Sequence, residues 1–388
     1  MRRLRIGILG TRGIPNHYGG FEQFAQYLSL GLVQRGHDVY VYNSSNHPYK
    51  DPEWNDVQII HCKDPEPQLG TFGQFFYDLN CINDARQRNY DVLLHLGYTS
   101  DSVWHWRWPK NTVNIVNMDG LEWTRSKYNT VTKKFLRWAE SLAARNAQVL
   151  IADSKYMQEY LAKTYKKNSV YIPYGAEEFS EPDLSVFRKY KVTPGEYLLL
   201  IARMEPENNI EMVIRGFLTS DSPYPLLIVG DTNNAFGRKM VSKYYTASVI
   251  FSGSIYDQSE LNNLRYHSVR YFHGHSVGGT NPSLLEAMAC QCNIAAHNNS
   301  FNRDILQEDA DFFSSAEEIS SIVSSVSSEK TNKKRKQSNL DKINSVYSLQ
   351  KNIDDYERLL FMAASKKMKG KDKLILSPAV YQTQKKFG

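Results

Sequence analysis

Two glycine-rich segments hold the residue types best suited to binding an anionic ligand. The first, GTRGIPNHYGGFEQF, runs from Gly10 to Phe24 between a short apolar strand and an amphipathic helix. Gly19 and Gly20 immediately precede the helix, where backbone N–H groups and the helix dipole favour a phosphate. A glycine-rich surface turn explains the same residues, and the segment by itself leaves both interpretations open.

This segment matches neither of two common nucleotide-binding fingerprints. Gly10 and Gly13 do not form GxGxxG, and the next strand ends in Asn43 and Ser44 rather than in the acid expected to hold a ribose. The segment also lacks the GK[ST] of a P-loop. A dinucleotide site or a P-loop is therefore not expected here.

The second segment, HGHSVGGTNPSLLEAMA, covers residues 273–289. Asn-Pro at 281–282 suits the cap and first position of a helix, and Gly-Gly at 278–279 lets the backbone approach a ligand. Glu286, about one turn into the helix, has a carboxylate that can accept hydrogen bonds from two hydroxyls, as a ribose requires. A capped helix with an exposed Glu explains the same residues.

Three further polar residues follow expected strands. Asp119 and Glu122, in NMDGLEW, have carboxylates suited to orienting a hydroxyl or a sugar, although a helix cap and a surface acid explain them equally well. His275 lies at a strand end beside Gly-Gly, and it suits a hydrogen bond to a sugar hydroxyl more than a purely structural role.

Short apolar strands alternate with amphipathic helices twice along the chain, which predicts two parallel sheets covered by helices. Such sheets bind ligands at the carboxyl ends of their strands. The turn-rich segment 171–183 predicts a crossing between domains. The polar segment 327–339 predicts an exposed connector, and a long helix is expected over 340–365. The expected strands and helices include Arg5–Leu9, Phe21–Gln34, Asp38–Tyr42, 91–97, 111–120, 147–154, 196–204, 208–219, 225–231, 235–245, 248–254, 257–266, 269–275 and 293–298.

The amino-acid composition limits the classes of protein to which the chain can belong. The chain has 388 residues, a net charge of +6 and 41% hydrophobic residues, which suits a two-domain globular protein that meets anions. The four cysteines form no zinc motif, so reduced thiols are expected. No stretch approaches the roughly 20 apolar residues of a membrane span. The basic residues are dispersed, so a nucleic-acid partner is not expected.

Four motifs, taken together, resemble one protein family. They are GTRGIPNHYGGFEQFAQYLSLGLVQRGHDVYVY, NMDGLEW, ARMEPENN and GHSVGGTNPSLLEAMA, and the resemblance covers nearly all of residues 1–365. The chain resembles family-4 retaining glycosyltransferases, most closely the rhamnosyltransferase branch of capsular and exopolysaccharide synthesis. The resemblance implies the α/β GT-B fold, with two doubly wound Rossmann-like domains facing a central cleft and a C-terminal helix that crosses back to the N-terminal domain.

The domain limits expected from the pattern and the resemblance are as follows. Residues 1–175, with the helix 345–365, form the acceptor-side domain. Residues 176–344 form the domain that binds the nucleotide sugar, and residues 366–388 form a basic tail.

The resemblance also assigns roles to individual residues. Arg203 matches the arginine that neutralises the donor diphosphate, Glu286 matches the acid that holds the ribose, and Gly20 matches a glycine beside the donor phosphate. The residues expected to bind the donor are Gly19, Gly20, Arg203, Asn208, Gly253, His275, Gly278, Gly279, Thr280, Asn281 and Glu286, and those expected in catalysis are Asp119, Glu122 and Arg203.

At three positions the chain departs from the wider family. Gly278 stands where the family has a Glu eight positions before the ribose acid, Asn208 where it has a Lys, and Asp119 where it has a His. Since Asn208 brings no positive charge to the diphosphate, Arg203 is expected to matter more than usual. The contacts to the donor sugar are left open by these departures.

Basic and aromatic residues are interleaved in the first half of the chain. Residues 121–146 mix aromatic rings with Lys and Arg, and WHWRWP places Trp104, Trp106 and Trp108 in alternation, on one face of an extended segment. Either an anionic membrane surface or ordinary packing accounts for this pattern. A lipid-linked, polyprenyl diphosphate saccharide acceptor would explain it, at the cytoplasmic face of the cell membrane.

The function expected is therefore retaining transfer of a sugar, with L-rhamnose the leading guess, from a nucleotide diphosphate to a lipid-linked saccharide in cell-surface polysaccharide synthesis. No cofactor or metal is expected. A nucleotide-sugar epimerase of the same fold and a non-catalytic subunit that binds a sugar nucleotide are the alternatives.

Overall fold

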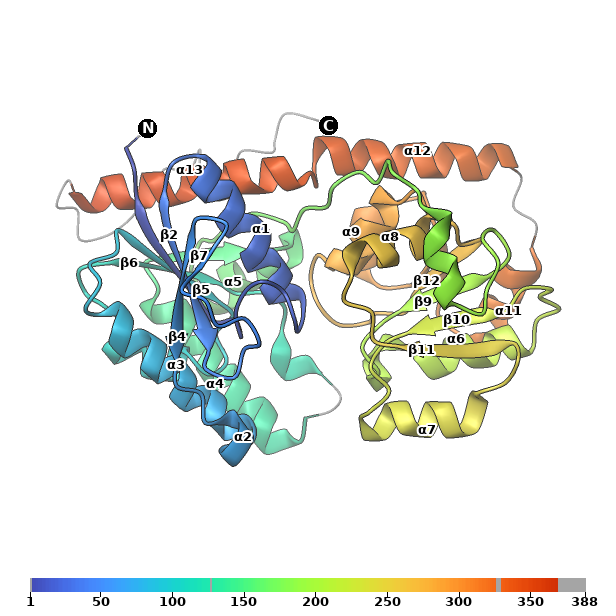
Figure 1. The fold of residues 1–388 in the computed structure, drawn as a ribbon, viewed down its shortest axis with the longest axis horizontal. Helices are drawn as coiled ribbons and strands as arrows, with labels where there is room; N and C mark the ends of the chain where they lie inside the picture. Colours follow the sequence, from blue (N-terminus) through green and yellow to red (C-terminus); the bar gives the residue numbers. More distant parts are fainter. Residues whose placement is uncertain (1, 126–127, 326–328, 369–388) are drawn as a thin grey trace. The chain divides into compact units, whose positions relative to one another are not determined.

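The computed structural model describes residues 2–125, 128–325 and 329–368, and they fold as two compact units (Figure 1). The first unit comprises Met1–Trp123, Thr130–Pro173 and the chain from Leu349 onward. The second comprises Thr124–Asn129 and Tyr174–Ser348. Apart from the short segment Thr124–Asn129, the chain passes from the first unit to the second after Pro173 and returns to the first at Leu349.

The first unit is built on a sheet with the strand order β3-β4-β2-β1-β5-β6-β7-β8. All described pairs are parallel except β3 with β4, which form an antiparallel edge. The strands are β1 (Arg5–Leu9), β2 (Asp38–Ser44), β3 (Glu53–Trp54), β4 (Val57–Cys62), β5 (Val92–Leu96), β6 (Val113–Asn117), β7 (Val149–Ala152) and β8 (Val170–Tyr171).

Helices cover both faces of this sheet, as expected for parallel strands that are apolar on both sides. Apolar residues of α3, α4 and α5 share a core with the strands, and α13 packs against α1, β5 and β6. The helices are α1 (Gly20–Gln34), α2 (Glu66–Leu69), α3 (Thr71–Ala85), α4 (Thr130–Asn146), α5 (Lys155–Tyr165) and α13 (Leu349–Met368), with short 3₁₀ turns η1 (Ser102–Arg107) and η2 (Glu122–Thr124).

The second unit repeats this plan with the strand order β11-β10-β9-β12-β13-β14, in which every described pair is parallel. The strands are β9 (Leu198–Ile201), β10 (Leu226–Val229), β11 (Val249–Gly253), β12 (Arg270–His273), β13 (Ile294–His297) and β14 (Asp311–Phe313). The helices and turns are η3 (Leu184–Lys189), η4 (Pro206–Asn208), α6 (Ile210–Leu218), α7 (Ala235–Tyr244), α8 (Gln258–Tyr266), α9 (Pro282–Ala289), α10 (Ser300–Leu306), α11 (Ala316–Ser324) and α12 (Glu329–Ser345).

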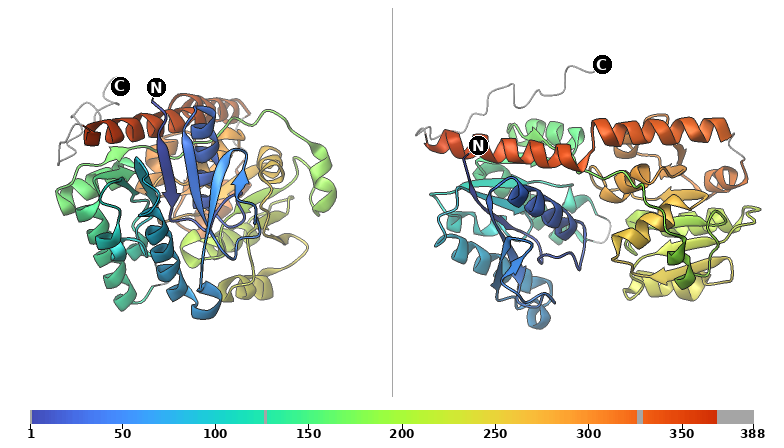
Figure 2. Two further views of the ribbon diagram at one scale, coloured as in Figure 1. Left: turned by 60° about the vertical axis from the view of Figure 1, so that its left-hand side comes forward. Right: turned by 45° about the horizontal axis from the view of Figure 1, so that its top comes forward.

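The C-terminal region differs from the sequence-based expectation. The connector expected over 327–339 is helical from Glu329, because it begins α12, and the single helix expected over 340–365 is divided between α12 and α13 (Figures 1 and 2). α12 packs against α9 in the second unit, whereas α13 packs in the first. Most of the expected basic tail, 369–388, lies outside the described residues.

Candidate functional site

Polar residues of the second unit gather where β9 and β12, neighbours in the sheet, end. Arg203 follows β9 and is exposed, and its guanidinium forms no hydrogen bond or ion pair with any residue that the structure describes. The loop 274–281 follows β12 and leads into α9. The carboxyl ends of neighbouring parallel strands are the usual ligand site of an open α/β sheet.

The turn after β9 is bonded directly to the loop after β12. The backbone N–H and Oγ of Ser276 both donate to the carbonyl of Glu207, over 3.1 and 2.7 Å. Asn209 donates its side-chain N–H to the carbonyl of Gly274 over 2.8 Å. A Cβ at Gly274 would lie 2.1 Å from the carbonyl oxygen of Asn208, so only glycine permits this approach. The two loops therefore form one rigid surface.

Asn208, expected to contact the donor, is buried in this surface. Its side-chain N–H donates to the carbonyl of Arg203 over 2.8 Å. This bond fixes the backbone that carries the exposed guanidinium. Asn208 therefore contacts the backbone of Arg203.

Two histidines are stacked where β12 leads into the same loop. The rings of His273 and His275 lie 4.4 Å apart and nearly parallel. Both ring nitrogens of His273 and the Nδ1 of His275 are buried without a hydrogen-bond partner among the described residues. Burial, with the charges of Arg203 and Arg125, lowers the pKa of His275 to about 3. Both rings are therefore neutral at physiological pH, and His275 can offer a hydrogen bond but no charge.

The N-terminus of α9 adopts the local structure that its sequence predicts. The side chain of Asn281 accepts from the backbone N–H of Ser283 over 3.0 Å, and Pro282 occupies the first turn. Gly278 has φ of +132°, a conformation that L side chains rarely adopt, and a Cβ there would meet no described atom within 4 Å. Gly279 is half-buried and Thr280 is buried. The helix therefore begins beside a loop whose backbone is not covered by side chains at Gly278.

Glu286, the expected ribose acid, forms an ion pair that the sequence did not indicate. Its Oε2 contacts Nη2 of Arg265 from α8. The Arg265 side chain is 1% exposed and that of Glu286 is 13% exposed. Only the arginine of this pair is fully enclosed, so the carboxylate retains access to solvent. No pattern in the polar sequence of α8 marks Arg265 as a partner of a residue 21 positions later.

Gly253 ends β11, at the same end of the sheet as the other donor candidates. It has φ of +79°, and a Cβ there would meet nothing within 4 Å. Its carbonyl accepts from Gly230, which follows β10, over 3.0 Å. The glycine therefore continues the sheet edge while leaving its surface open.

In the first unit, the glycine-rich segment leads from β1 into α1. Gly19 is the N-cap of α1, and Gly20 begins the helix with no described atom within 4 Å of an added Cβ. The buried Glu22 carboxylate accepts from the N–H of Arg12 over 2.8 Å. Burial raises the pKa of Glu22 although the hydrogen bond from Arg12 favours its charge. Part of the expected phosphate cradle is thus occupied by the chain's own carboxylate.

Arg12 is likewise engaged within the first unit. Its guanidinium forms an ion pair with Glu66 of α2 over 2.6 Å and lies 4.0 Å from the ring centroid of Tyr18. Its side chain therefore tethers the glycine-rich segment to α2.

Asp119 and Glu122 follow β6 in the first unit. Asp119 is half-buried with φ of +45°, a strained conformation for a residue other than glycine, and its N–H donates to Oδ1 of Asn117 over 3.0 Å. Glu122 is half-buried in η2, and its N–H contacts the Tyr98 hydroxyl. Both residues therefore lie at the carboxyl end of β6 and are partly exposed.

The three alternating tryptophans do not share a face, which corrects the expected extended segment. Residues 102–107 form the 3₁₀ turn η1, because hydrogen bonds such as Trp104 N–H to the Asp101 carbonyl close the backbone into turns. Trp108 is buried and its Nε1 donates to Asp101, whereas Trp106 is 58% exposed. Only the exposed ring remains available to a partner.

Exposed apolar side chains of the first unit are concentrated on α2, α3, η1 and α4. Ring contacts run from Phe72 through Phe75 and Phe135 to Trp138, with centroids 6.4, 5.7 and 5.6 Å apart. We call the exposed members the aromatic surface: Leu69, Phe72, Phe76, Trp106, Val131 and Trp138. The sequence indicated the α4 part of this surface and missed the part on α2 and α3.

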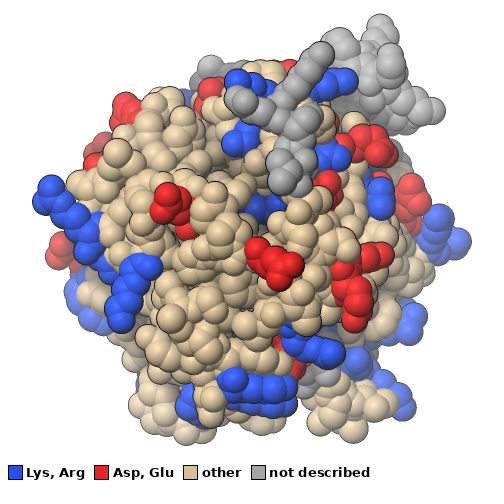
Figure 3. Space-filling view, turned by 90° about the vertical axis from the view of Figure 1, so that its right-hand side faces the viewer, with Lys and Arg blue, Asp and Glu red and all other residues tan. Residues whose placement is uncertain are grey.

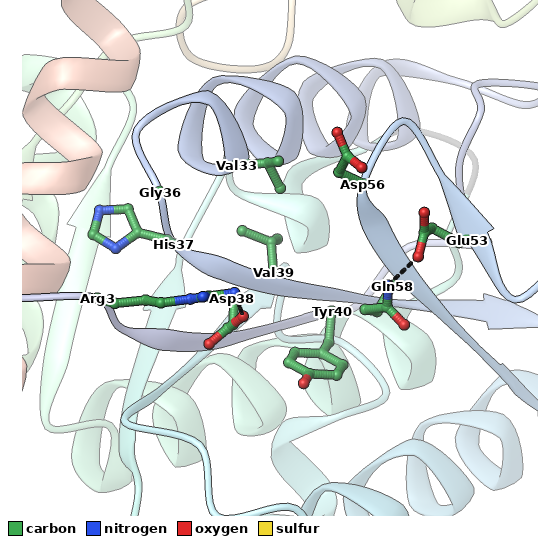
Figure 4. A pocket seen from close by; sticks show the side chains of 10 residues that line it. All are labelled: Arg3, Val33, Gly36, His37, Asp38, Val39, Tyr40, Glu53, Asp56 and Gln58. Carbon is green, nitrogen blue, oxygen red and sulfur yellow. Dashed lines mark hydrogen bonds and ion pairs between the residues drawn. The ribbon is translucent and has the colours of Figure 1, made fainter.

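A hollow of about 450 Å³ in the first unit lies elsewhere (Figure 4). It is lined by Arg3, Val33, Gly36, His37, Asp38, Val39, Tyr40, Glu53, Asp56 and Gln58. These residues surround the amino ends of β2 and β4, opposite the end where ligands bind such sheets. Side chains that could hold a metal ion form no cluster within the described residues.

The fold can now be compared with known structures. The chain matches sucrose-phosphate synthase from Thermosynechococcus elongatus with a TM-score of 0.75 and 16% identity, covering 93% of this chain and 100% of that one. It matches Anabaena HepE, solved with UDP and glucose, with a TM-score of 0.71 and 13% identity, covering 92% and 100%. A glycosyltransferase from Rickettsia africae gives 0.65 and 12%, covering 94% and 99%. The chain therefore has the GT-B fold of glycosyltransferases.

Family models divide the chain at nearly the same place as the two sheets. Residues 185–342 match the model described as glycosyl transferases group 1. Residues 3–177 match a model described as a domain of unknown function, DUF1972. The search of curated proteins found no match.

Proposed function

We propose that the protein is a retaining glycosyltransferase that uses a nucleotide diphosphate sugar. The observation that carries this proposal is the exposed Arg203 guanidinium, which has no hydrogen bond or ion pair with a described residue. Asn208 holds the backbone carbonyl of Arg203, in the turn bonded to the loop that leads into α9. A guanidinium and a helix N-terminus both stabilise a diphosphate. The match of residues 185–342 to group 1 glycosyltransferases supports this assignment.

In the proposed reaction, the acceptor hydroxyl oxygen bonds to the anomeric carbon as the bond from that carbon to the diphosphate oxygen breaks. The bonding electrons remain on the diphosphate, and the departing phosphate oxygen takes the acceptor proton. Arg203 and the α9 N-terminus stabilise the charge that develops on the diphosphate. Neutral His275 and the Gly278–Asn281 backbone hydrogen-bond the sugar, Glu286 holds the ribose and Gly253 borders the nucleobase.

The first unit contributes the acceptor side of the proposed reaction. Asp119 and Glu122 orient the acceptor hydroxyl, and Gly19 and Gly20 approach the donor phosphate. L-rhamnose is the leading sugar, on the motifs that resemble capsular and exopolysaccharide rhamnosyltransferases. The acceptor we propose is a polyprenyl diphosphate-linked saccharide.

The aromatic surface supports binding to an anionic bilayer. Lys134 and Arg137 of α4 are exposed beside it and Lys133 is half-buried, whereas the helix's only acid, Glu140, is fully buried. Aromatic rings and cations together favour the interface of an anionic membrane. No described helix is both long and apolar enough to cross a membrane.

On the face drawn in Figure 3, Lys and Arg are interspersed with Asp and Glu, whereas a nucleic-acid binder carries a continuous basic stripe.

The donor proposal is tested by calorimetric binding of UDP and TDP, followed by a screen of nucleotide sugars with lipid-linked acceptors. Arg203→Ala should weaken diphosphate binding at least about 10-fold, since a charge-assisted contact is lost. Arg188→Ala, which removes another exposed arginine of the second unit, is the matched control.

Three results would contradict this proposal. Absence of nucleotide binding by the wild type would exclude the donor site. Conversion of a nucleotide sugar without an acceptor would favour an epimerase, and binding without turnover of any donor would favour a non-catalytic subunit.

The membrane proposal is tested by flotation with vesicles of neutral or anionic phospholipid. Phe72→Ser with Trp138→Ser, and separately Lys133→Glu with Lys134→Glu, should each reduce recovery with anionic vesicles several-fold. Lys155→Glu with Lys163→Glu changes the same charge on α5 as a control. Equal flotation of all variants would exclude this surface.

A further inference from the structure

We propose that Arg265 is a positioning residue, which holds the Glu286 carboxylate in the orientation that binds the donor ribose. This role rests on the proposed function, because it assigns a supporting partner to the same donor site. Arg265 itself is enclosed and is not expected to touch the ligand.

Arg265 is fixed by contacts on two helices. Its Nη1 donates to Oδ1 of Asn262, on its own helix, over 3.1 Å. Its Nη2 donates to Oε2 of Glu286 and, over 3.3 Å, to Oγ of Ser283. The hydroxyl of Tyr271 lies 2.8 Å from the same Oγ. The guanidinium therefore links α8 and β12 to the first turn of α9.

The difference in exposure between the partners separates this pair from an ordinary surface ion pair. An arginine that is 1% exposed loses its hydration, and that cost is offset only when its charge is paired and hydrogen-bonded. The Glu286 side chain is 13% exposed, so it is less enclosed than the cation. One end of the pair is thus anchored in the core while the other remains accessible.

The arrangement has one consequence for ligand binding. The contacts restrict the rotamers of Glu286, so less conformational entropy is lost when a ribose binds. Other titratable groups that act on Arg265 or its surroundings are Tyr271, Cys290, Cys292 and Lys336 of α12.

A double-mutant cycle on UDP and TDP binding tests the proposal. Arg265→Met should weaken binding by about 10-fold or more in the wild type, the loss expected from a disordered charged hydrogen-bond partner. In the Glu286→Ala background the same change should have almost no effect, because the group it positions is gone. Arg265→Lys should recover part of the affinity, since it restores the charge without the planar fork.

Arg270→Met is the matched control, because Arg270 is also a buried arginine of the second unit and pairs with Asp311. It should lower the melting temperature without a comparable loss of nucleotide affinity. Equal losses from Arg265→Met with and without Glu286 would overturn the positioning role, as would unchanged binding by Arg265→Met.

The outcome also separates this proposal from the proposed function. If Arg265→Met fails to fold, the Arg265→Lys cycle decides the question. If the wild type binds UDP or TDP but the cycle is additive, only the positioning role fails. If the wild type binds neither, the proposed function fails as well.

Discussion

The stacked histidines of the second unit make its stability depend on pH. Burial lowers the pKa of His275 to about 3 and lowers that of His273 well below its ordinary value. In the unfolded chain both histidines take up protons near pH 6.5. As the pH falls below 6.5 the unfolded state therefore binds more protons than the folded state, and the folded state loses stability.

We predict a loss of about 2 kcal/mol for each of these histidines between pH 7 and pH 5, since pH 5 lies about 1.5 units below their ordinary pKa. His273→Phe, which keeps a ring in the stack, should remove about half of this pH dependence. Urea unfolding at the two pH values measures it. His17→Phe, at an exposed histidine, should leave the dependence unchanged, and an unchanged dependence in His273→Phe would contradict the explanation.

Substitution by alanine should affect stability differently at Gly274 and at Gly20. Gly274→Ala places a Cβ 2.1 Å from the Asn208 carbonyl oxygen, so it should destabilise the second unit by about 2 kcal/mol. Gly20→Ala meets no described atom within 4 Å and should change the stability by less than about 1 kcal/mol. Thermal unfolding compares the two. Equal changes in the melting temperature of the two variants would show that the loops after β9 and β12 can move apart without loss of stability.

Local patterns predicted some site residues and missed others for a physical reason. The cap at Asn281 follows from backbone chemistry within three residues, and the structure confirms it. The Arg265–Glu286 pair and the engagement of Glu22 by Arg12 depend on tertiary contacts, which no spacing along the chain reveals. The roles of the catalytic candidates Asp119, Glu122 and Arg203, and of the donor-binding candidates, remain predictions.

At the scale of elements, the buried Glu140 of α4 holds several segments of the first unit together. Its carboxylate accepts from the hydroxyls of Tyr160 and Tyr165 over 2.7 and 2.6 Å, and from Nε1 of Trp123 over 3.1 Å. The Tyr98 hydroxyl lies 3.3 Å away. Helix α5 and the segment that contains Glu122 are therefore bonded to one side chain.

We predict that Glu140→Leu destabilises the first unit by about 3–5 kcal/mol, because several buried donors lose their acceptor. Glu140→Gln should cost less, since an amide oxygen can accept part of the network. Burial and the hydrogen bond to Glu140 raise the pKa of Tyr160 to about 12, so ultraviolet titration of the Gln variant should show it ionising closer to pH 10. An unshifted titration would contradict the role of Glu140.

Most elements were predictable where the apolar period is regular. β1 has the predicted bounds, Arg5–Leu9, and α1 begins one residue before the predicted helix. The sequence analysis did not predict helix α3 or the β3–β4 edge. In α3, Phe72 and Phe76 are exposed, so its apolar residues do not follow the spacing of one buried helix face. The first part of α12, expected as a connector up to residue 339, was not predicted because its sequence is strongly polar. Tertiary contacts such as the ion pair of Lys342 with Asp309 hold this helix.

At the scale of the whole molecule, the last described helix completes the first unit. The α13 side chain of Tyr356 accepts a hydrogen bond from Asn117, and Asn352 donates to the Pro173 carbonyl. Glu357 contacts both Arg35 and His37. Gly31 of α1 lies against Ile353, where an added Cβ would be 2.7 Å from two carbons of that side chain.

We predict that Gly31→Leu loosens α13 and destabilises the first unit by about 2–3 kcal/mol through overpacking. Hydrogen exchange should increase over 349–365 while the second unit stays protected. Ile353→Ala should restore part of the stability in a Gly31→Ala background, because it removes the atoms that clash. Unchanged exchange in Gly31→Leu would show that α13 is not held by this contact.

The position of α13 also has a consequence during synthesis. The ribosome makes the strands of the first unit first, but the helix that covers α1, β5 and β6 emerges only after the entire second unit. Until then the nascent first unit lacks the helix that covers one of its apolar faces. A stop codon anywhere in the second unit would remove α13 and would therefore destabilise the first unit as well. The first unit can complete its fold only after the second unit has been synthesised.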